Sequence, residues 1–285
     1  MNKRSKSFQL LFLGLACLLQ SCNASSRSET TEIVENEVVY KTVGDTELKL
    51  HVFQCDQSGR RPAIVFFFGG GWVGGSVNQF FPHCEHFASK GMVAISAEYR
   101  IKSKHGTTPF ECVADGKSAI RYVRIHAEEL GIDPRKIVAS GGSAGGHVAA
   151  CTGVIEGFDE EGDDTAVSSK PNAMVLFNPV IDTTERGYGA EKLKGQEKTL
   201  SPAHHVVTGI APTIIFHGTA DTTVPFENVE RFCRKMNEAG NECRLVPYEG
   251  MKHGFFNYTK EKDHKSFNDT IRRTEEFLRK LGYFK

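Results

Sequence analysis

Residues 136–150 read KIVASGGSAGGHVAA, in which an apolar run leads into a single serine flanked by four glycines. The run KIVAS is typical of a buried strand, and the small residues after Ser143 are typical of the start of a helix. A tight turn between the two strains the backbone at the serine, and a side chain at Gly141 or Gly145 would collide with the neighbouring helix or strand. We therefore expect Ser143 to present its hydroxyl at a strand-to-helix bend. A serine that only caps a helix in a glycine-rich turn would fit the same short pattern.

Apolar runs and helical stretches alternate along the chain from residue 37 onward. Residues 37–54 predict two strands around a turn, and the further apolar runs, typical of strands buried on both faces of a sheet, are 63–68, 92–97, 136–140, 173–178 and 213–218. The helical stretches between and after them include 79–91, 109–131, 226–240 and 266–282. This order predicts one α/β domain with a mostly parallel central sheet, helices on both faces, and ligands at the carboxyl ends of the strands.

Two polar residues follow predicted strands downstream of the serine. Asp221 lies in FHGTADTTVP, and His253 lies in YEGMKHGFF. A serine hydroxyl is a poor nucleophile near neutral pH, so it needs an imidazole that takes its proton and a carboxylate that orients the imidazole. The order serine, aspartate, histidine favours nucleophilic catalysis on such a sheet. The competing interpretations are a turn-capping Asp221, a surface His253, and Asp182 after LFNPV as the acid.

A glycine run, FFFGGGWVGGS at residues 66–76, follows another of the apolar runs. Consecutive glycines can turn backbone N–H groups toward an oxyanion that forms when a serine attacks a carbonyl. A phosphate loop would continue with Gly-Lys-Ser/Thr, and a dinucleotide fold would space its glycines as G-x-G-x-x-G, and the run has neither feature. The run is therefore interpreted as part of an oxyanion hole.

These motifs together resemble the esterase/lipase group of α/β-hydrolases, which includes hormone-sensitive-lipase-like esterases and bacterial carbohydrate esterases. The resemblance covers most of residues 37–283 and rests on FGGGW, GGSAGGH, HGTADTTVP and KHGF. It implies an α/β-hydrolase fold, and it assigns a nucleophile, an acid, a base and three oxyanion-binding amides, namely Ser143, Asp221, His253 and the amides of Gly70, Gly71 and Ala144. Such a mechanism needs no cofactor, and the short segment 180–201 leaves the fold with a minimal lid. Phe68 stands where the family usually has a histidine that helps to fix the glycine loop, so the chain departs from the family in the rigidity of this loop and not in its chemistry.

Two other classes of protein share this fold. Prolyl-oligopeptidase-like peptidases usually carry a large propeller domain, whereas only some thirty residues precede the hydrolase core here. A binding protein that has lost its activity would be expected to lack Ser143, Asp221 or His253, and all three are present. An ester hydrolase is therefore the favoured interpretation.

The N-terminus resembles a bacterial export signal. Lys3, Arg4 and Lys6 precede an apolar stretch at residues 8–19 that is too short to span a bilayer comfortably. The following LQSC resembles a lipobox, which predicts lipidation of Cys22 and attachment to the cell envelope; an ordinary cleaved secretory signal and a retained anchor are the alternatives. We expect a signal peptide over 1–22, a polar tether over 23–36 and the hydrolase domain over 37–285.

Charge and cysteine content exclude several other functions. The 35 basic and 35 acidic residues cancel, and no basic tract is interleaved with aromatic residues, so nucleic acid is not an expected partner. Six cysteines remain after the signal region, without the paired spacing of a zinc site. Cys233 and Cys243 flank a predicted helix end and turn, so they form either a disulfide or a pair of buried free thiols.

Several other polar residues are interpreted as structural. His147 is expected to be buried behind the serine bend, and Asp115 and Arg121 are expected to pair within the fold. His83 and His86 lack the glutamate pattern of a metalloprotease. The acidic stretch DEEGDD at 159–164 is expected to be a solvated loop, with calcium binding as the less favoured alternative.

The segment 180–201, VIDTTERGYGAEKLKGQEKTLS, occupies the place where lipases of this fold carry a lid. It is short and rich in charge and glycine, so it offers little apolar surface to a long acyl chain. The expected substrate is therefore a short acyl ester, most favourably an acetyl ester. The family resemblance, together with the expected envelope placement, implies an ester of a carbohydrate such as acetylated xylan. Feruloylated carbohydrates are the alternative substrate.

Overall fold

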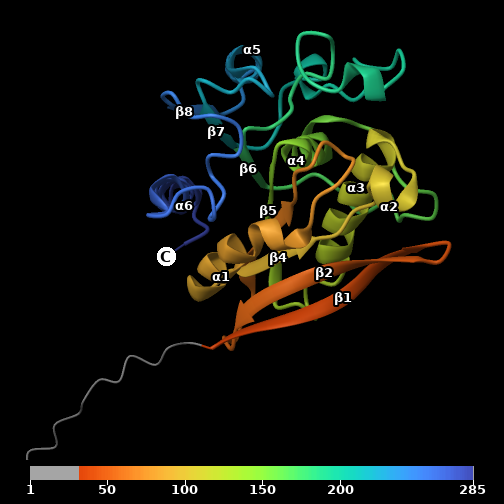
Figure 1. Cartoon of the computed structure of the whole chain (residues 1–285). Helices are drawn as coiled ribbons and strands as arrows, with labels where there is room; N and C mark the ends of the chain where they lie inside the picture. Colours follow the sequence, from red (N-terminus) through yellow and green to blue (C-terminus); the bar gives the residue numbers. More distant parts are fainter. Residues whose placement is uncertain (1–31, 285) are drawn as a thin grey trace, which may run out of the picture. The chain divides into compact units, whose positions relative to one another are not determined.

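The computed structural model describes residues 32–284, which are built around one eight-stranded sheet (Figure 1). Its strands lie in the order β1-β2-β4-β3-β5-β6-β7-β8. The five pairs from β4 through β3 to β8 are parallel, whereas β1–β2 and β2–β4 are antiparallel. The mostly parallel sheet predicted from the apolar runs is therefore confirmed. The strand bounds are β1 Ile33–Val43, β2 Thr46–Cys55, β3 Arg61–Phe67, β4 Val93–Ala97, β5 Ile132–Gly142, β6 Ala173–Phe177, β7 Thr213–Gly218 and β8 Cys243–Tyr248.

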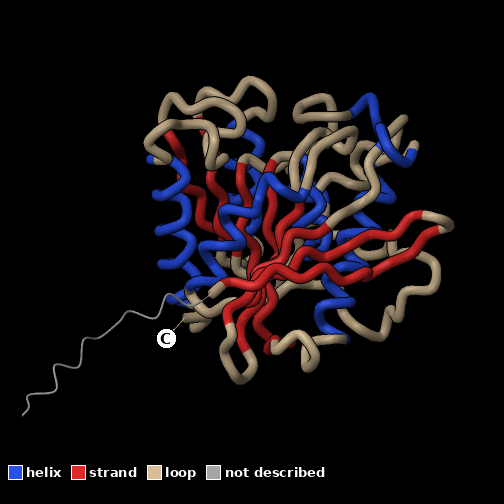
Figure 2. The backbone as a smooth tube through the Cα atoms, turned by 60° about the horizontal axis from the view of Figure 1, so that its bottom comes forward, coloured by secondary structure: helices blue, strands red, loops and turns tan. Residues whose placement is uncertain are grey.

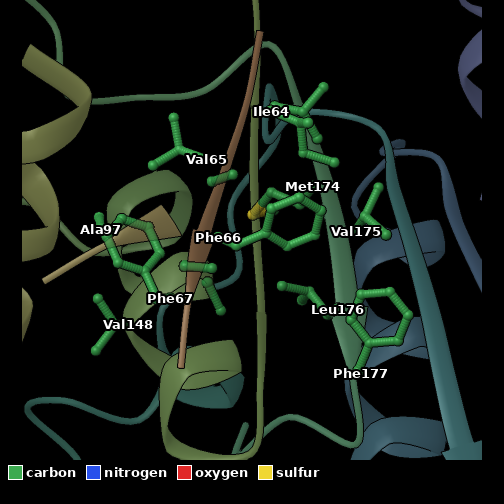
Figure 3. Packing of buried hydrophobic residues seen from close by; sticks show 14 of the residues in the cluster. Ile64, Val65, Phe66, Phe67, Ala97, Val148, Met174, Val175, Leu176 and Phe177 are labelled. Carbon is green, nitrogen blue, oxygen red and sulfur yellow. The ribbon is translucent and has the colours of Figure 1, made fainter. Parts of the chain in front are cut away.

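Helices cover both faces of the sheet, as expected. Successive strand side chains point to opposite faces; the Phe66 ring stacks on Phe87 of α1, whereas Phe67 packs against α3 at Gly116. Figure 3 shows these side chains within the core that joins the layers. Helix α6 lies beside α1, and His86 Nε2 of α1 is 2.7 Å from Glu275 Oε1 of α6. The helices are α1 Phe81–Ser89, α2 Lys102–His105, α3 Pro109–Ile125, α4 Ala144–Val154, α5 Phe226–Glu238 and α6 Lys265–Lys280.

Strand β1 begins earlier than the sequence suggested. It starts at Ile33, where Ile33 pairs with Cys55 of β2, so residues 33–36 belong to a strand and not to the expected polar tether. The strand lies at the edge of the sheet, and most of its side chains are exposed. An exposed edge strand carries polar residues, so the start of β1 has the composition of a polar linker. Figure 2 shows the β1–β2 hairpin extending past the other strands. Residues 1–22 and most of the expected tether lie outside the described residues.

The acidic stretch 159–164 differs from the solvated loop that the sequence predicted. Asp159 and Asp163 bind Arg121 at 2.6 and 3.0 Å, and Glu160 binds both Lys41 and Arg100. Only part of the stretch is therefore a solvated loop, because these three carboxylates neutralise largely buried cations. Together with Asp115, which also binds Lys41 and Arg100, they form what we call the ion-pair cluster, made of Lys41, Arg100, Asp115, Arg121, Asp159, Glu160 and Asp163.

Cys233 of α5 and Cys243 of β8 lie next to one another as buried free thiols. Hydrogen bonding to Cys243 lowers the pKa of the Cys233 thiol, although burial opposes the change. The structure thus has the free-thiol state of the two alternatives that the sequence left open.

The segment between β6 and β7, residues 178–212, contains two single-turn 3₁₀ helices, Ala190–Lys192 and Pro202–His204, and no α-helix. This segment contributes Tyr188 to the active-site cavity described below.

Among the described helices, none has the length and apolar composition needed to cross a membrane.

Candidate active site

Ser143 sits at the bend between β5 and α4, with backbone angles φ 56° and ψ −121°. The strain is supported locally, because the Ser143 amide donates to the Phe177 carbonyl at 3.0 Å. A Cβ on Gly145 would lie 2.0 Å from the Phe67 carbonyl oxygen, and one on Gly141 would lie 2.5 Å from the Gly145 carbonyl oxygen. Both glycines are therefore required by close backbone approach, as the sequence pattern predicted.

The structure brings Ser143, His253 and Asp221 into one hydrogen-bonded chain. His253 Nε2 is 2.9 Å from Ser143 Oγ, and His253 Nδ1 is 2.7 Å from Asp221 Oδ2. An ionised carboxylate only accepts hydrogen bonds, so Nδ1 carries the proton and donates to Asp221. In the neutral imidazole, Nε2 is then an acceptor that can receive the proton of the Ser143 hydroxyl.

Asp221 is held by more groups than His253 alone. Its Oδ1 accepts from the amides of Thr223 and Val224, each at 2.9 Å, and His217 Nε2 lies 3.3 Å from its Oδ2. Burial raises the pKa of the Asp221 carboxyl, but the hydrogen bonds from His217, His253 and Val224 outweigh burial and hold that pKa well below its usual range. The side chain is therefore a permanent anion that fixes the orientation of His253.

His217 is a site residue that the sequence analysis missed. It lies on β7 four residues before Asp221, is fully buried, and also donates from Nε2 to the Val224 carbonyl at 2.9 Å. Since both of its neighbours accept hydrogen bonds, Nε2 must carry a proton. The histidine in FHGTAD was the available signal, although a short motif does not say where a buried ring points.

Asp182, the alternative acid, lies elsewhere. Its Oδ1 accepts from the amide and hydroxyl of Thr184 at 2.9 and 2.6 Å, and its Oδ2 lies 3.4 Å from Arg231 Nη2. These contacts commit both carboxylate oxygens away from His253. Asp221 is the carboxylate that the structure places on the imidazole.

The glycine loop lies beside the serine. A Cβ on Gly69 would be 3.3 Å from Ser143 Cβ, and Gly70 and Gly71 have φ values of 130° and 63°. Within residues 32–284, no acceptor pairs with the amides of Gly70 and Gly71, and Ala144 begins α4 directly after Ser143. The three amides named in the sequence analysis are thus near Ser143, and those of Gly70 and Gly71 are free to bind an oxyanion.

Two groups replace the family histidine at Phe68 in holding this loop. Tyr99 stacks on Phe68 with ring centroids 4.3 Å apart and donates its hydroxyl to the Phe68 carbonyl at 2.6 Å. Gln79 Oε1 accepts from the Gly69 amide at 2.6 Å. The loop is therefore anchored on both sides of the Phe68–Gly69 peptide.

A cavity of about 510 Å³ opens above Ser143 and His253. Its walls are the glycine loop and side chains from four other segments of the chain, namely Gln79, Asn178, Tyr188, Thr223, Phe256 and Asn257. Tyr188 Oη accepts from Lys192 Nζ at 3.0 Å, and a Cβ on Gly71 would lie 2.8 Å from that oxygen. One wall is therefore polar and adjoins the candidate oxyanion hole.

His147 has the structural role expected of it. It is fully buried one turn after Ser143, donates to the Leu200 carbonyl at 2.6 Å and meets the Trp72 ring edge-on. Burial lowers the pKa of His147 to about 4, although the hydrogen bond to Leu200 opposes the change. The ring therefore stays neutral and ties α4 to the segment between β6 and β7.

Comparison with known proteins places the chain among esterases. The BD-FAE family model matches residues 50–236, which include Ser143 and Asp221. The structure of Thermogutta terrifontis esterase 2 phosphoramylated by tabun is 50% identical, with a TM-score of 0.85, over 88% of this chain and 96% of that chain. The butyrate-bound form of the same esterase is 48% identical, with a TM-score of 0.83, over 88% of this chain and 95% of that chain.

Curated relatives are more distant. A probable isoprenylcysteine alpha-carbonyl methylesterase of Arabidopsis thaliana is 27% identical over 77% of this chain and 51% of its own length. An acetylxylan esterase of Xylanibacter ruminicola is 29% identical over 70% of this chain and 41% of its own length. The chain thus spans about half the length, or less, of the curated relatives it matches.

Proposed function

The chain belongs to the BD-FAE family of α/β-hydrolase esterases, and we propose that it hydrolyses short-chain esters of carbohydrates, with acetyl esters such as acetylated xylan as the preferred class. The observation that carries the proposed chemistry is the hydrogen-bonded chain from Asp221 through His253 to Ser143, beside the free amides of Gly70 and Gly71. The reaction needs no cofactor, because these groups supply a nucleophile, a base and an oxyanion hole.

In the proposed mechanism, Ser143 Oγ attacks the ester carbonyl while His253 Nε2 takes the hydroxyl proton. Asp221 stabilises the imidazolium that forms, and the amides of Gly70, Gly71 and Ala144 bind the oxyanion. His253 then protonates the alcohol oxygen as the carbon–oxygen bond breaks. Water, deprotonated by the same imidazole, hydrolyses the acyl-enzyme and restores the Ser143 hydroxyl.

The Tyr188 hydroxyl in the cavity wall supports a hydroxyl-rich alcohol as the leaving group. An ammonium group only donates, so Tyr188 Oη must be the acceptor in its 3.0 Å bond to Lys192. No described residue accepts the Tyr188 proton, and it therefore remains for a ligand in the cavity. A sugar, which has many hydroxyl acceptors, would use this donor better than an aliphatic alcohol would.

Two observations support a short acyl group. The segment between β6 and β7 forms no α-helical lid, and the cavity of about 510 Å³ has glycines and amide side chains on several sides. Propionate and butyrate are bound in structures of Thermogutta terrifontis esterase 2, and an acetylxylan esterase is among the curated relatives. An acetyl group fits these features without an extended apolar channel.

The test compares 4-nitrophenyl acetate, butyrate and octanoate, then acetyl release from acetylated xylan, feruloyl release from feruloylated sugars and cleavage of peptides, with Ser143→Ala as the control. Because each methylene that a pocket accommodates stabilises binding by about 1 kcal/mol, chain-length preference reports pocket size. We expect the highest kcat/KM on acetate, and Ser143-dependent acetyl release from xylan. Preference for octanoate with no release from either carbohydrate would refute the proposed substrate, and cleavage of peptides alone would replace it with a peptidase.

We also propose that Cys22 is lipidated and holds the enzyme on the bacterial cell envelope. The charged residues 3–6, the short apolar stretch and LQSC support this placement from the sequence alone, since they lie outside the described residues. Cys22→Ala should release the protein into the soluble fraction or block its processing. Unchanged membrane association of that variant would refute the anchor.

A further inference from the structure

A chain of three side-chain hydrogen bonds connects the glycine loop to the loop that carries His253. The Gly69 amide donates to Gln79 Oε1 at 2.6 Å, Gln79 Nε2 donates to Asn257 Oδ1 at 2.8 Å, and Asn257 Nδ2 donates to the Gly254 carbonyl at 2.8 Å. Gly69 directly precedes the free amides, and Gly254 directly follows the base. The two amide side chains therefore bridge the two halves of the catalytic machinery, although they are 178 residues apart in sequence.

The backbone fixes the direction of this bridge at both ends. A peptide N–H can only donate, so Gln79 must present its oxygen to Gly69 and its nitrogen to Asn257. A peptide carbonyl can only accept, so Asn257 must present its nitrogen to Gly254 and its oxygen to Gln79. Every donor meets an acceptor in one arrangement of the two side chains, and turning either amide over would break two hydrogen bonds.

Each loop has other anchors, but these bind it to its own side of the site. Tyr99 holds the Phe68 carbonyl, and Asn178 Oδ1 accepts from the Gly254 amide at 2.9 Å. Gly254 has a φ of 76°, a left-handed conformation that lets the carbonyl turn toward Asn257. Within residues 32–284, the Gln79–Asn257 pair is the only direct hydrogen-bonded link between the two loops.

We infer that Gln79 and Asn257 are positioning residues that hold the oxyanion-binding amides and His253 in register with each other. The inference rests on the proposed esterase reaction, in which both groups must act on the same carbonyl at the same moment. Without the bridge, each loop keeps its own anchors and the substrate still binds, but the donors and the base no longer approach the carbonyl in the required geometry. Removal of the bridge therefore lowers kcat and leaves KM nearly unchanged.

The test uses variants that keep side-chain volume and remove hydrogen bonding, Gln79→Met and Asn257→Leu, alone and together, in the full chain with 4-nitrophenyl acetate as substrate. We expect each single variant to lower kcat about 10- to 100-fold, with KM changed by less than about threefold. Because the bridge acts as a unit, the double variant should lose about as much as the worse single variant. Multiplication of the two losses would overturn the inference.

Asn241→Leu is the matched control for lost stability. Asn241 is a buried amide that, like Asn257, binds backbone, accepting from Gly209 and Ile210 and donating to Val207, but it lies just before β8, away from the strand ends that carry the site. This variant should lower the thermal unfolding midpoint and leave kcat unchanged. An equal loss of kcat in Asn241→Leu and Asn257→Leu would show that the bridge contributes only to stability.

Hydrogen exchange of the Gly69 amide tests whether the Gln79–Asn257 bridge is intact, and it needs no ester substrate. The amide should be protected in the native protein and should exchange faster in Gln79→Met and also in Asn257→Leu, although Asn257 does not touch it. Unchanged exchange in Asn257→Leu would overturn the coupling. If the native protein shows no Ser143-dependent hydrolysis, the proposed function fails, and the exchange result still decides whether the bridge holds the two loops together.

Discussion

Two polar regions inside this domain are built in opposite ways, the active site at the carboxyl ends of the strands and the ion-pair cluster between β1, α3 and residues 159–163. In the cluster, buried Asp115 accepts from Lys41 at 2.6 Å and from the Arg100 side chain at 2.8 Å, so charges of opposite sign meet directly. In the active site, free amides face a cavity and the Ser143 hydroxyl lies 2.9 Å from His253 Nε2.

The backbone differs in the same way. Three of the residues with positive φ that are not glycine lie at or beside the site, namely Trp72, Ser143 and Asn178, whereas no member of the cluster has a positive φ. Asn178 also leaves its Nδ2 buried without a hydrogen-bond partner. A strained backbone and an unpartnered amide thus occur together at the site, where the chain must bind a reacting molecule. Each also occurs singly elsewhere, as the positive φ of Phe158 beside Asp159 and the unpartnered ring of His83 show.

The largest expected effect comes from removing the nucleophile or the base. Ser143→Ala and His253→Ala should each lower kcat about 10⁴-fold or more, and the double variant should lose little further, because triad members act as one unit. Unfolding of Ser143→Ala should be nearly unchanged, since the Ser143 hydroxyl bonds only to His253. Ester hydrolysis and thermal unfolding, measured on the same samples, check the predicted loss of kcat and the predicted stability. A strongly destabilised Ser143→Ala would show that the active site, like the ion-pair cluster, contributes to stability.

Asp221→Asn is expected to lower kcat by about 10³- to 10⁴-fold, because an amide no longer holds the imidazole in the required tautomer. Asp182→Asn is the matched control, since Asp182 binds Thr184 and Arg231 and does not contact His253. Steady-state kinetics on 4-nitrophenyl acetate would compare the two. Near-native turnover in Asp221→Asn together with loss in Asp182→Asn would reverse the assignment of the acid.

Asp115→Ala tests the other region and should act on stability alone. Removing this carboxylate leaves Lys41 and Arg100 partly unpaired, so we expect a loss of about 3–5 kcal/mol in the free energy of unfolding, with kcat of the folded protein unchanged. Glu161→Ala, at an exposed position in the same acidic stretch, should have little effect. Denaturant unfolding measures the loss. Should Asp115→Ala fold too poorly to measure, Asp115→Asn, which keeps an acceptor, should show a smaller loss.

His83 offers a smaller, pH-dependent effect, because it is a buried titratable ring without a partner. Neither ring nitrogen has a hydrogen bond, and the ring lies among Phe66, Phe80, Phe177, Phe256 and Phe267. Burial, with a smaller contribution from His86, lowers the pKa of His83 to about 3. Between that value and the unfolded pKa of about 6.5, the unfolded chain binds a proton that the folded chain does not, so stability falls as the pH falls.

His83→Phe should remove this dependence. Between pH 8 and pH 5, the native protein should lose about 2 kcal/mol of its free energy of unfolding because the His83 ring stays unprotonated in the folded state. His83→Phe lacks this ring, so its free energy of unfolding should fall by about 2 kcal/mol less over the same pH range. His147 stays in place and continues to contribute its own acid sensitivity. Denaturant midpoints at pH 8 and pH 5 test the difference, and parallel pH profiles for the two proteins would contradict it.

Sequence reasoning succeeded where the cause is local. Gly141 is needed by close approach to Gly145 within the same turn, and apolar runs predict strands buried on both faces. Ser143, Asp221 and His253 lie one, three and five residues after the ends of β5, β7 and β8. It was wrong at β1, whose polar edge looks like a linker, and at residues 159–164, whose carboxylates bind cations more than thirty residues away. In both cases the deciding partner lies on another element.

The sequence by itself thus determined the elements, their order and the chemical groups that follow each strand, because helix and strand periodicity is encoded within a few residues. Only the tertiary structure decided which distant groups meet. It chose Asp221 over Asp182 for His253, added His217 behind the acid, and joined Gln79 to Asn257 across 178 residues. The physical reason is that hydrogen bonds and ion pairs act over a few ångströms, and the strand order that brings such groups within reach is a property of the whole sheet.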